Sequence, residues 1–383
     1  MTGQSPRRGA TSISRPFTGW NLVVAWATTV AAIWVAANLI GRYVPSLRGS
    51  TAPRSPVEVL STWDGSRHTH LAAAGYDPVG PAQRVYVALP LLPIIARLLG
   101  GPFSREALAG ILFSQLCLLG CVLLLGRIAH GDQWAPLRLQ PGFWLLVSPL
   151  SFFFSVFYTE SLFLLLSLLM FVFYRQQRIG AASVAGLLAG LTRPTALLLP
   201  VLFVSDLVRG VRRRRGWRGP LLCAVAPLAG LALWMGYVGY VMRDPLAYIH
   251  IGARYFDRRW TLPFAPLLRD ALDNVQGLRY GELPLPDKTV RMFSAFVVLA
   301  VLAWGWRRLE GAMVAYVVAS MLFLHSQEPH SATARYELVL FPIFLLLPQT
   351  PIGRRHLAPV VAILLAAIQL VFLIDYGSWQ WVA

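Results

Sequence analysis

The sequence predicts an all-α protein that crosses a membrane many times. Apolar residues make up 56% of its 383 residues and charged residues only 13%, against roughly 45–50% and about 25% in soluble domains. A chain with so little charge cannot cover a globular surface that faces water. Apolar runs recur from residue 20 to residue 373, and most approach the length that crosses a hydrocarbon core of about 30 Å. These observations exclude the soluble and disordered classes of protein.

The net charge of +17 does not indicate a protein that binds nucleic acid. Every basic residue is an arginine except Lys288, and many arginines lie in short segments between apolar runs, as the positive-inside rule expects. No folded domain is left to carry a basic, aromatic surface, so we expect no nucleic-acid partner. Cys117, Cys121 and Cys223 lie inside apolar runs and are predicted to be buried small hydrophobic residues.

The first apolar run, residues 20–40, is predicted to be a membrane span. It is too long for the core of a cleaved signal, and no convincing small-residue cleavage site follows. Arg7, Arg8 and Arg15 precede it, so residues 1–19 are expected to form a cytoplasmic tail and residues 20–383 a single integral membrane domain. The later runs are 85–99, 107–125, 142–157, 161–174, 181–207, 220–242, 290–306, 312–324, 338–347 and 358–373.

Charge predicts the orientation of these spans. Residues 209–218 contain six arginines and no acid, the strongest cytoplasmic signal in the chain. With the N-terminus also inside, the polar stretches 41–84, 243–289 and 325–337 fall outside, and the first of them is a large extracytoplasmic loop. The preference for arginine over lysine is typical of a GC-rich, bacterial genome. We therefore expect a multi-pass protein of a bacterial plasma membrane with about eleven crossings.

Two arrangements of the middle of the chain give that number. If every run crosses once, four arginines end outside (Arg127, Arg138, Arg175 and Arg178). We favour a second arrangement, in which residues 85–99 stop short of a full crossing and residues 181–207 form two short helices. The break falls at Arg193–Pro194, because proline lacks a donor and disfavours helix at the preceding residue. Tyr158, Glu160 and Arg193 then face outside.

Few charged residues lie at membrane depth, and each is a functional candidate because a charge there is costly. Glu160 separates two apolar runs and could be a polar turn; Arg193 could anchor a helix end. Both lie on the same side as Asp64 in the favoured arrangement. If Asp64 opens a helix, its carboxylate lies near unpaired backbone donors and His68 shares its face. The alternative is a capped amphipathic helix on the membrane surface.

Short motifs follow one another along residues 20–348. They are Trp63-Asp64-Gly65, Leu89-Pro90-Leu91-Leu92-Pro93, Tyr158-Thr159-Glu160-Ser161-Leu162-Phe163, Thr192-Arg193-Pro194-Thr195, Asp244-Pro245-Leu246 and Arg335-Tyr336. In this order they resemble the motifs of the PIG-V-like mannosyltransferase family, which includes the second mannosyltransferase of glycosylphosphatidylinositol synthesis. The chain departs from the family at Arg67-His68, where relatives more often carry aromatics, and at Arg254, where bacterial relatives often carry glutamine.

The resemblance implies a GT-C-type transmembrane helical bundle and an inverting glycosyltransferase. Such an enzyme moves mannose from a polyprenyl-phosphate donor to a lipid-linked or glycan acceptor at the outer face, among membrane lipids. It implies that Asp64, in the first outer loop, is the catalytic base. Donor and acceptor contacts are expected from eight residues: Trp63, His68, Tyr158, Glu160, Arg193, Arg254, Arg335 and Tyr336.

The chemistry of inverting transfer agrees with these residue types. One carboxylate takes the proton of the acceptor hydroxyl as the oxygen attacks the anomeric carbon. The leaving group is a phosphate, so a cation should stabilise it. Arg335 is the first candidate, since a guanidinium can grip phosphate with two hydrogen bonds, and Arg193 is the second. No Asp-x-Asp pair occurs, and we predict neither a metal nor a cofactor.

A lipid or sugar transporter, or flippase, is the alternative function. It predicts repeated halves and charges near the midplane of broken helices. The sequence has no internal repeat, and its intramembrane charges lie at the ends of apolar runs, so the enzyme is favoured. The acceptor stays open, because bacteria generally make no glycosylphosphatidylinositol anchors.

Overall fold

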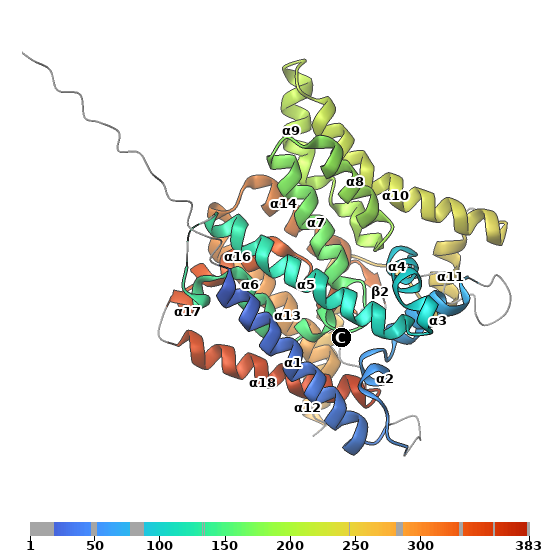
Figure 1. Ribbon diagram of the computed structural model, residues 1–383. Coiled ribbons are helices and arrows are strands. Elements are labelled where there is room, and N and C mark those ends of the chain that lie inside the picture. Colours follow the sequence, from blue (N-terminus) through green and yellow to red (C-terminus); the bar gives the residue numbers. More distant parts are fainter. Residues whose placement is uncertain are drawn as a thin grey trace, which may run out of the picture.

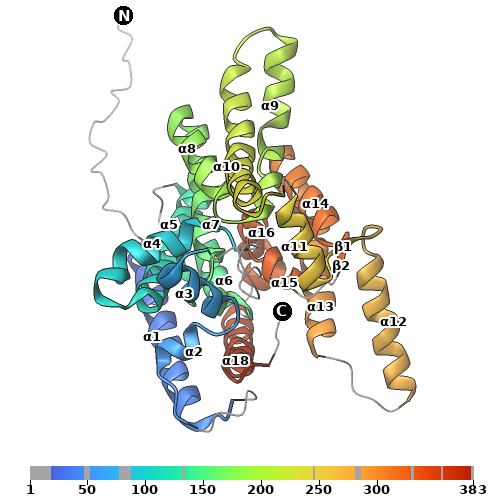
Figure 2. The ribbon, with the colours of Figure 1, turned by 90° about the vertical axis from the view of Figure 1, so that its right-hand side faces the viewer.

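The computed structural model describes residues 19–46, 52–76, 88–131, 133, 135–244, 246–280, 286–328, 332–354 and 357–380. Apart from Gly19, the predicted cytoplasmic tail lies outside these residues, as does Pro245 of the Asp244-Pro245-Leu246 motif. Most of the described chain is helical, and two short strands are its other regular elements (Figure 1 and Figure 2).

The helices of the first half are α1 (Trp20–Tyr43), α2 (Pro56–Leu60), α3 (Asp64–Ala74), α4 (Leu91–Gly100), α5 (Glu106–His130), α6 (Pro141–Val147), α7 (Glu160–Arg175), α8 (Ile179–Gly190) and α9 (Val201–Arg212). Those of the second half are α10 (Arg218–Met242), α11 (Ala247–Phe256), α12 (Ala265–Arg279), α13 (Pro286–Gly305), α14 (Gly311–Leu324), α15 (Thr333–Glu337), α16 (Phe341–Leu346), α17 (Pro351–Arg354) and α18 (Ala358–Gly377). Strands β1 (Arg259–Trp260) and β2 (Gln327–Glu328) pair antiparallel.

Within the described chain, six helical segments are long and apolar enough to cross a membrane: Trp20–Tyr43, Glu106–His130, Pro194–Arg212, Arg218–Met242, Asp287–Arg308 and Ala358–Gly377. Shorter apolar helices cover Leu91–Phe103, Ile179–Gly190 and Gly311–Leu324. The protein is thus an all-α membrane protein, as predicted. The count of about eleven crossings and the GT-C arrangement stay predictions.

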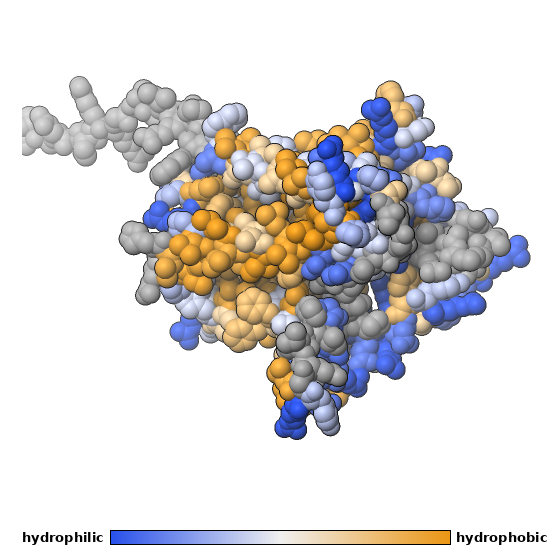
Figure 3. All heavy atoms as spheres, turned by 90° about the horizontal axis from the view of Figure 1, so that it is seen from below, coloured by the Kyte–Doolittle hydropathy of each residue, from blue (hydrophilic) through white to orange (hydrophobic). Residues whose placement is uncertain are grey.

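Apolar side chains on the outside of the bundle fit a lipid environment. Helices α1 and α18 expose Val35, Leu39, Ile363, Leu364 and Val371, among others. A broad hydrophobic area covers much of the face seen in Figure 3, with hydrophilic residues toward its margins. This distribution is the reverse of a soluble surface, as the composition predicts.

Two of the predicted spans are not continuous helices. Residues 142–157 contain α6, which ends before Ser148-Pro149, then a 3-10 turn at Ser151–Phe154 and irregular backbone. Residues 338–347 contain only the short α16. Prolines mark the helix boundaries here: Pro149 follows the end of α6, Pro342 lies in the first turn of α16, and Pro348 follows its end. Irregular backbone at membrane depth requires protein around it, and both segments are buried in the bundle.

The favoured break within residues 181–207 is present. Helix α8 ends at Gly190, and Arg193 adopts φ −148° and ψ 145° before Pro194 starts a 3-10 turn that leads into α9. Proline favours this extended conformation in the residue before it. The Leu91 N–H donates to Leu191 O at 3.2 Å, so α4 holds the turn that presents Arg193.

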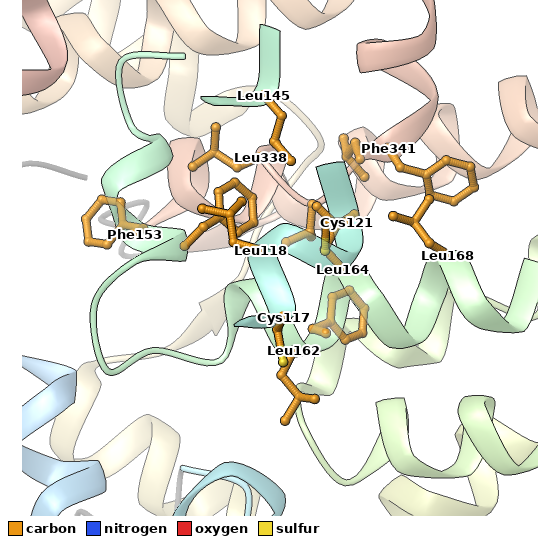
Figure 4. Packing of buried hydrophobic residues seen from close by; sticks show 14 of the residues in the cluster. Cys117, Leu118, Cys121, Leu145, Phe153, Leu162, Leu164, Leu168, Leu338 and Phe341 are labelled. Atoms are coloured by element: carbon orange, nitrogen blue, oxygen red, sulfur yellow. The ribbon is translucent and has the colours of Figure 1, made fainter. Parts of the chain in front are cut away.

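The core packs α5 against α7 and the irregular segments. Cys117, Leu118 and Cys121 of α5 meet Leu164 and Leu168 of α7 in a layer that also receives residues of α6 and α16 (Figure 4). Each of the three cysteines is free and buried, so the prediction that they pack as small hydrophobic residues is confirmed.

Candidate active site

Four charged residues from distant parts of the chain form one ion-pair network. The Nη1 atom of Arg335 lies 2.9 Å from Asp64 Oδ2, and its Nε lies 3.1 Å from Glu160 Oε1. Arg193 Nη1 approaches the same Glu160 oxygen at 2.6 Å. Opposite charges therefore alternate in the order Asp64, Arg335, Glu160, Arg193, and we call this set the Asp64–Arg193 network. The residues predicted from separate motifs come together here.

The network is buried at one end and open at the other. Glu160, Arg193 and Arg335 are 1%, 3% and 5% exposed, whereas the Asp64 side chain is 26% exposed. Buried charges are stable only when they are paired, and each of the three buried residues has an opposite partner. Asp64 is thus the member of the network that a substrate can reach.

Asp64 is presented by an unusual backbone. The preceding residue, Trp63, has φ 55° and ψ −119°, a conformation that is costly for a residue with a side chain. The Trp63 indole packs against Trp379 with ring centroids 5.3 Å apart. The Asp64 N–H donates to the Tyr158 hydroxyl at 3.1 Å, and Asp64 is the first residue of α3. These contacts hold the carboxylate toward Arg335.

Two guanidinium groups set the protonation state of Asp64. Arg67, one turn later on α3, forms an ion pair with Asp64 Oδ1. Burial by itself raises the pKa of the Asp64 carboxyl, but the charges of Arg335 and Arg67 outweigh it and hold the pKa well below its usual range. Asp64 is consequently an ionised carboxylate with one oxygen facing each arginine.

His68 shares the Asp64 face of α3, as the spacing predicts, but its ring is enclosed by protein. It is 5% exposed and packs against Phe157 with ring centroids 5.6 Å apart. Burial lowers the pKa of His68 to about 4, opposed in part by the charges of Asp64 and Glu160. The imidazole is therefore neutral near pH 7, and its Nδ1 has no hydrogen-bond partner among the described residues.

Aromatic rings surround the two buried arginines. The Arg335 guanidinium carbon lies 4.9 Å from the Tyr158 ring centroid and 5.4 Å from that of Tyr336. The Arg193 guanidinium carbon lies 4.6 Å from the centroid of the same Tyr336 ring. The Arg193 Nη1 atom also donates to Thr159 Oγ1 at 3.3 Å. Ring faces attract cations, so the aromatic members of the two motifs help to hold the arginines in place.

The chain positions Arg335 through α15 and its neighbours. Glu337 on α15 accepts a hydrogen bond from Ser294 and contacts His325 Nε2 at 2.8 Å, and the side chains of Glu337 and His325 are both buried. Strand β2 follows His325, and its Glu328 pairs with Arg259 and Arg269. The predicted outer stretches 243–289 and 325–337 thus join through β1 and β2 and fix α15 beside Glu160.

One predicted residue lies apart from the network. Arg254, in the last turn of α11, is exposed and its guanidinium lies 5.5 Å from the neighbouring Tyr255 ring. Arg258, by contrast, lies close enough to the network to interact electrostatically with Asp64 and Tyr336, and it donates a hydrogen bond to Tyr248. Asp257, with φ 49°, ends α11 and turns the chain between these two arginines.

Arg67 and Arg258 flank one aromatic ring at the mouth of the site. Their guanidinium carbons lie 5.0 Å and 5.6 Å from the Phe256 ring centroid. Both keep solvent-exposed surface, in contrast to Arg335 and Arg193. Sequence reasoning did not select either as a site residue, because nothing in the spacing separates Arg258 from Arg254 or Arg259.

Comparison with known protein families and with curated proteins finds no match to this chain. Within the part of the chain that the structure describes, no group of three or more His, Cys, Asp or Glu side chains is arranged to hold a metal ion. A functional assignment therefore depends on the site itself.

Proposed function

We propose that the protein is an inverting membrane glycosyltransferase of the PIG-V-like type. It would move a sugar, with mannose as the first choice, from a polyprenyl-phosphate donor to a lipid-linked or glycan acceptor at the outer face of a bacterial plasma membrane. The observation that carries the proposal is the Asp64–Arg193 network. It joins residues of four of the motifs on which the resemblance rests, and it leaves one carboxylate accessible.

In this proposal Asp64 is the general base. The acceptor hydroxyl oxygen attacks the anomeric carbon, the bond from that carbon to the phosphate oxygen breaks, and the hydroxyl proton passes to Asp64. The bonding pair leaves with the phosphate. Arg335 and Arg67 each occupy one lone-pair direction of the Asp64 oxygens, and a carboxylate oxygen has a second direction for the proton.

The contacts favour a different role for Arg335 from the one that the sequence predicts. Two of its nitrogens face carboxylates, and only 5% of the residue is exposed. We therefore assign it to holding Asp64 ionised and in place. Arg67 and Arg258 are accessible cations near Asp64, and we assign the binding of the leaving phosphate to them. A guanidinium can form two parallel hydrogen bonds to a phosphate.

The proposal is tested with purified protein in nanodiscs, polyprenyl-phosphate mannose labelled in the sugar, and a membrane lipid extract as acceptor. The expected result is a new labelled product, and Asp64→Asn should lower its rate by roughly 10²–10⁴-fold, the contribution of a general base. Asp206→Asn is the control, because Asp206 contacts Tyr174 and Arg209 far from the network.

Two outcomes would contradict the proposal. One is Asp64→Asn with near-normal turnover. The other is movement of the labelled lipid across the bilayer with no new glycoside, which would support the flippase alternative. Donors that carry glucose or galactose, assayed in parallel, decide the sugar.

A further inference from the structure

A cavity of about 950 Å³ lies between the ends of several helices. It is bounded by the C-terminal turns of α5 and α7, the 3-10 turns at Leu137–Leu139 and Trp306–Arg308, and the start of α14. Its described charged lining consists of Arg127, Arg138, Arg175, Arg308 and Glu310, and His130 contributes an imidazole. We call this space the basic cavity.

The basic cavity is separate from the candidate active site. Helix α7 begins at Glu160, inside the Asp64–Arg193 network, and ends at Arg175, which lines the cavity. Fifteen residue steps along an α-helix cover roughly 22 Å. The Tyr174 hydroxyl donates to Asp206 on α9 at 2.7 Å, so the cavity lies toward the end of the bundle that carries the arginines of residues 209–218. The charge rule predicts that this end is cytoplasmic.

Positive charge dominates the cavity lining. Of the described lining residues, four are arginines and one is an acid. Glu310 pairs with Arg175 at 2.9 Å, and Arg308 stacks on Trp304 at 3.8 Å. The positive-inside rule explains why arginines gather at this end of the bundle. It does not require arginines from four separate segments to meet around one cavity.

Much of the rest of the cavity wall is apolar, although Gln176 and Gln349 also line it. Leu139, Phe171, Val172, Met313 and Leu345 lie between the arginines. A cavity with both a cationic group and an apolar wall is complementary to an amphiphilic anion, whose phosphate faces the guanidinium groups while its hydrocarbon follows the wall. A small hydrophilic anion would leave the apolar wall unused.

We propose that the basic cavity binds an anionic phospholipid of the adjacent leaflet, with the lipid phosphate ester held by Arg138 and Arg308. This inference is independent of the proposed transfer reaction, since the two sites share no residue. The site adds a lipid contact at the face opposite to the one where the donor would react.

Native mass spectrometry of protein released from nanodiscs tests the proposal by counting retained lipid. Phosphatidylglycerol should be retained in preference to phosphatidylcholine. The double variant Arg138→Gln/Arg308→Gln should weaken that retention about 30-fold. Each arginine contributes about 1 kcal/mol to binding an anionic lipid, and about 2 kcal/mol corresponds to this factor. The matched control is Arg213→Gln/Arg215→Gln, which removes the same charge from the neighbouring basic segment outside the cavity lining and should retain the lipid.

A second variant raises affinity, so the test does not depend on a loss. Glu310→Gln removes the acid that neutralises Arg175 and should strengthen retention about threefold, as expected for an exposed pair. Equal retention of the two lipids, or equal loss in both double variants, would overturn the proposal. Displacement of the lipid by glycerol phosphate at equal concentration would overturn the choice of a lipid and indicate a soluble phosphate ester.

Discussion

Arg335 offers a sharp test of the site, because one guanidinium bridges two carboxylates through different atoms. Its Nη1 contacts Asp64 and its Nε contacts Glu160, and the side chain is buried. A lysine ammonium is a single point and cannot occupy both positions. Arg335→Lys should therefore lose either the hydrogen bond to Asp64 or the ion pair with Glu160, and the loss of one such charged contact costs about 1.5–3 kcal/mol. Arg335→Met should cost roughly 3–5 kcal/mol, because two carboxylates lose a buried partner.

The activity should fall with both variants, since Arg335 holds the proposed base. The assay is the transfer rate per folded protein, measured beside the thermal unfolding midpoint in the same detergent. Arg291 supplies a matched control: it is 5% exposed and bridges Asp270 and Asp287 at 2.9–3.3 Å. Arg291→Lys should lower the unfolding midpoint similarly and leave the transfer rate unchanged.

Two results would refute this reasoning. Arg335→Lys with wild-type stability and wild-type turnover would show that the bridge has no role. Equal losses of turnover in Arg335→Lys and Arg291→Lys would reduce the effect to general destabilisation.

Other predictions concern the mouth of the site, pH and orientation. Arg258→Gln should raise the donor KM by about tenfold, the value of one charged contact, whereas Arg254→Gln should leave it unchanged; equal effects would remove Arg258 from the phosphate role. Because the pKa of His68 is lowered from 6.5 to about 4, the unfolded chain takes up a proton before the folded one does. The contribution of His68 to the free energy of unfolding should therefore be fully present above pH 6.5 and fall by about 3 kcal/mol as the pH drops to 4. The variant His68→Gln should flatten this dependence of stability on pH, and an unchanged dependence would exclude His68 as its cause. Cysteines introduced at Ser66, Asn274 and Gln327 should react with an impermeant thiol reagent in intact cells, while one at Gly216 should not, and the reverse pattern would invert the orientation.

Local sequence was sufficient for the features that depend on neighbouring residues. Hydropathy summed over a window predicted the long apolar helices, because burial of the backbone in lipid requires helix. Pro194 predicted the break between α8 and α9, since its ring acts on Arg193 directly. The i, i+4 spacing placed Asp64 and His68 on one face of α3. The motifs that resemble those of a known family contain all four members of the Asp64–Arg193 network.

Only the tertiary structure decided how those residues meet. Asp64 and Arg335 are 271 positions apart, and their contact depends on the packing of α3, α7 and α15, which no periodicity encodes. Residues 142–157 are as apolar as a span, yet the backbone after α6 is not α-helical. Surrounding helices supply hydrogen-bond partners for this backbone: Gln115 donates to Ser155 O at 3.0 Å, and Ser114 donates to O of the adjoining Tyr158 at 3.2 Å. Arg254 and Arg258 are four residues apart, but the left-handed Asp257 ends α11 between them. Long-range geometry of this kind depends on how separate helices pack, and a single sequence carries no local signal for it.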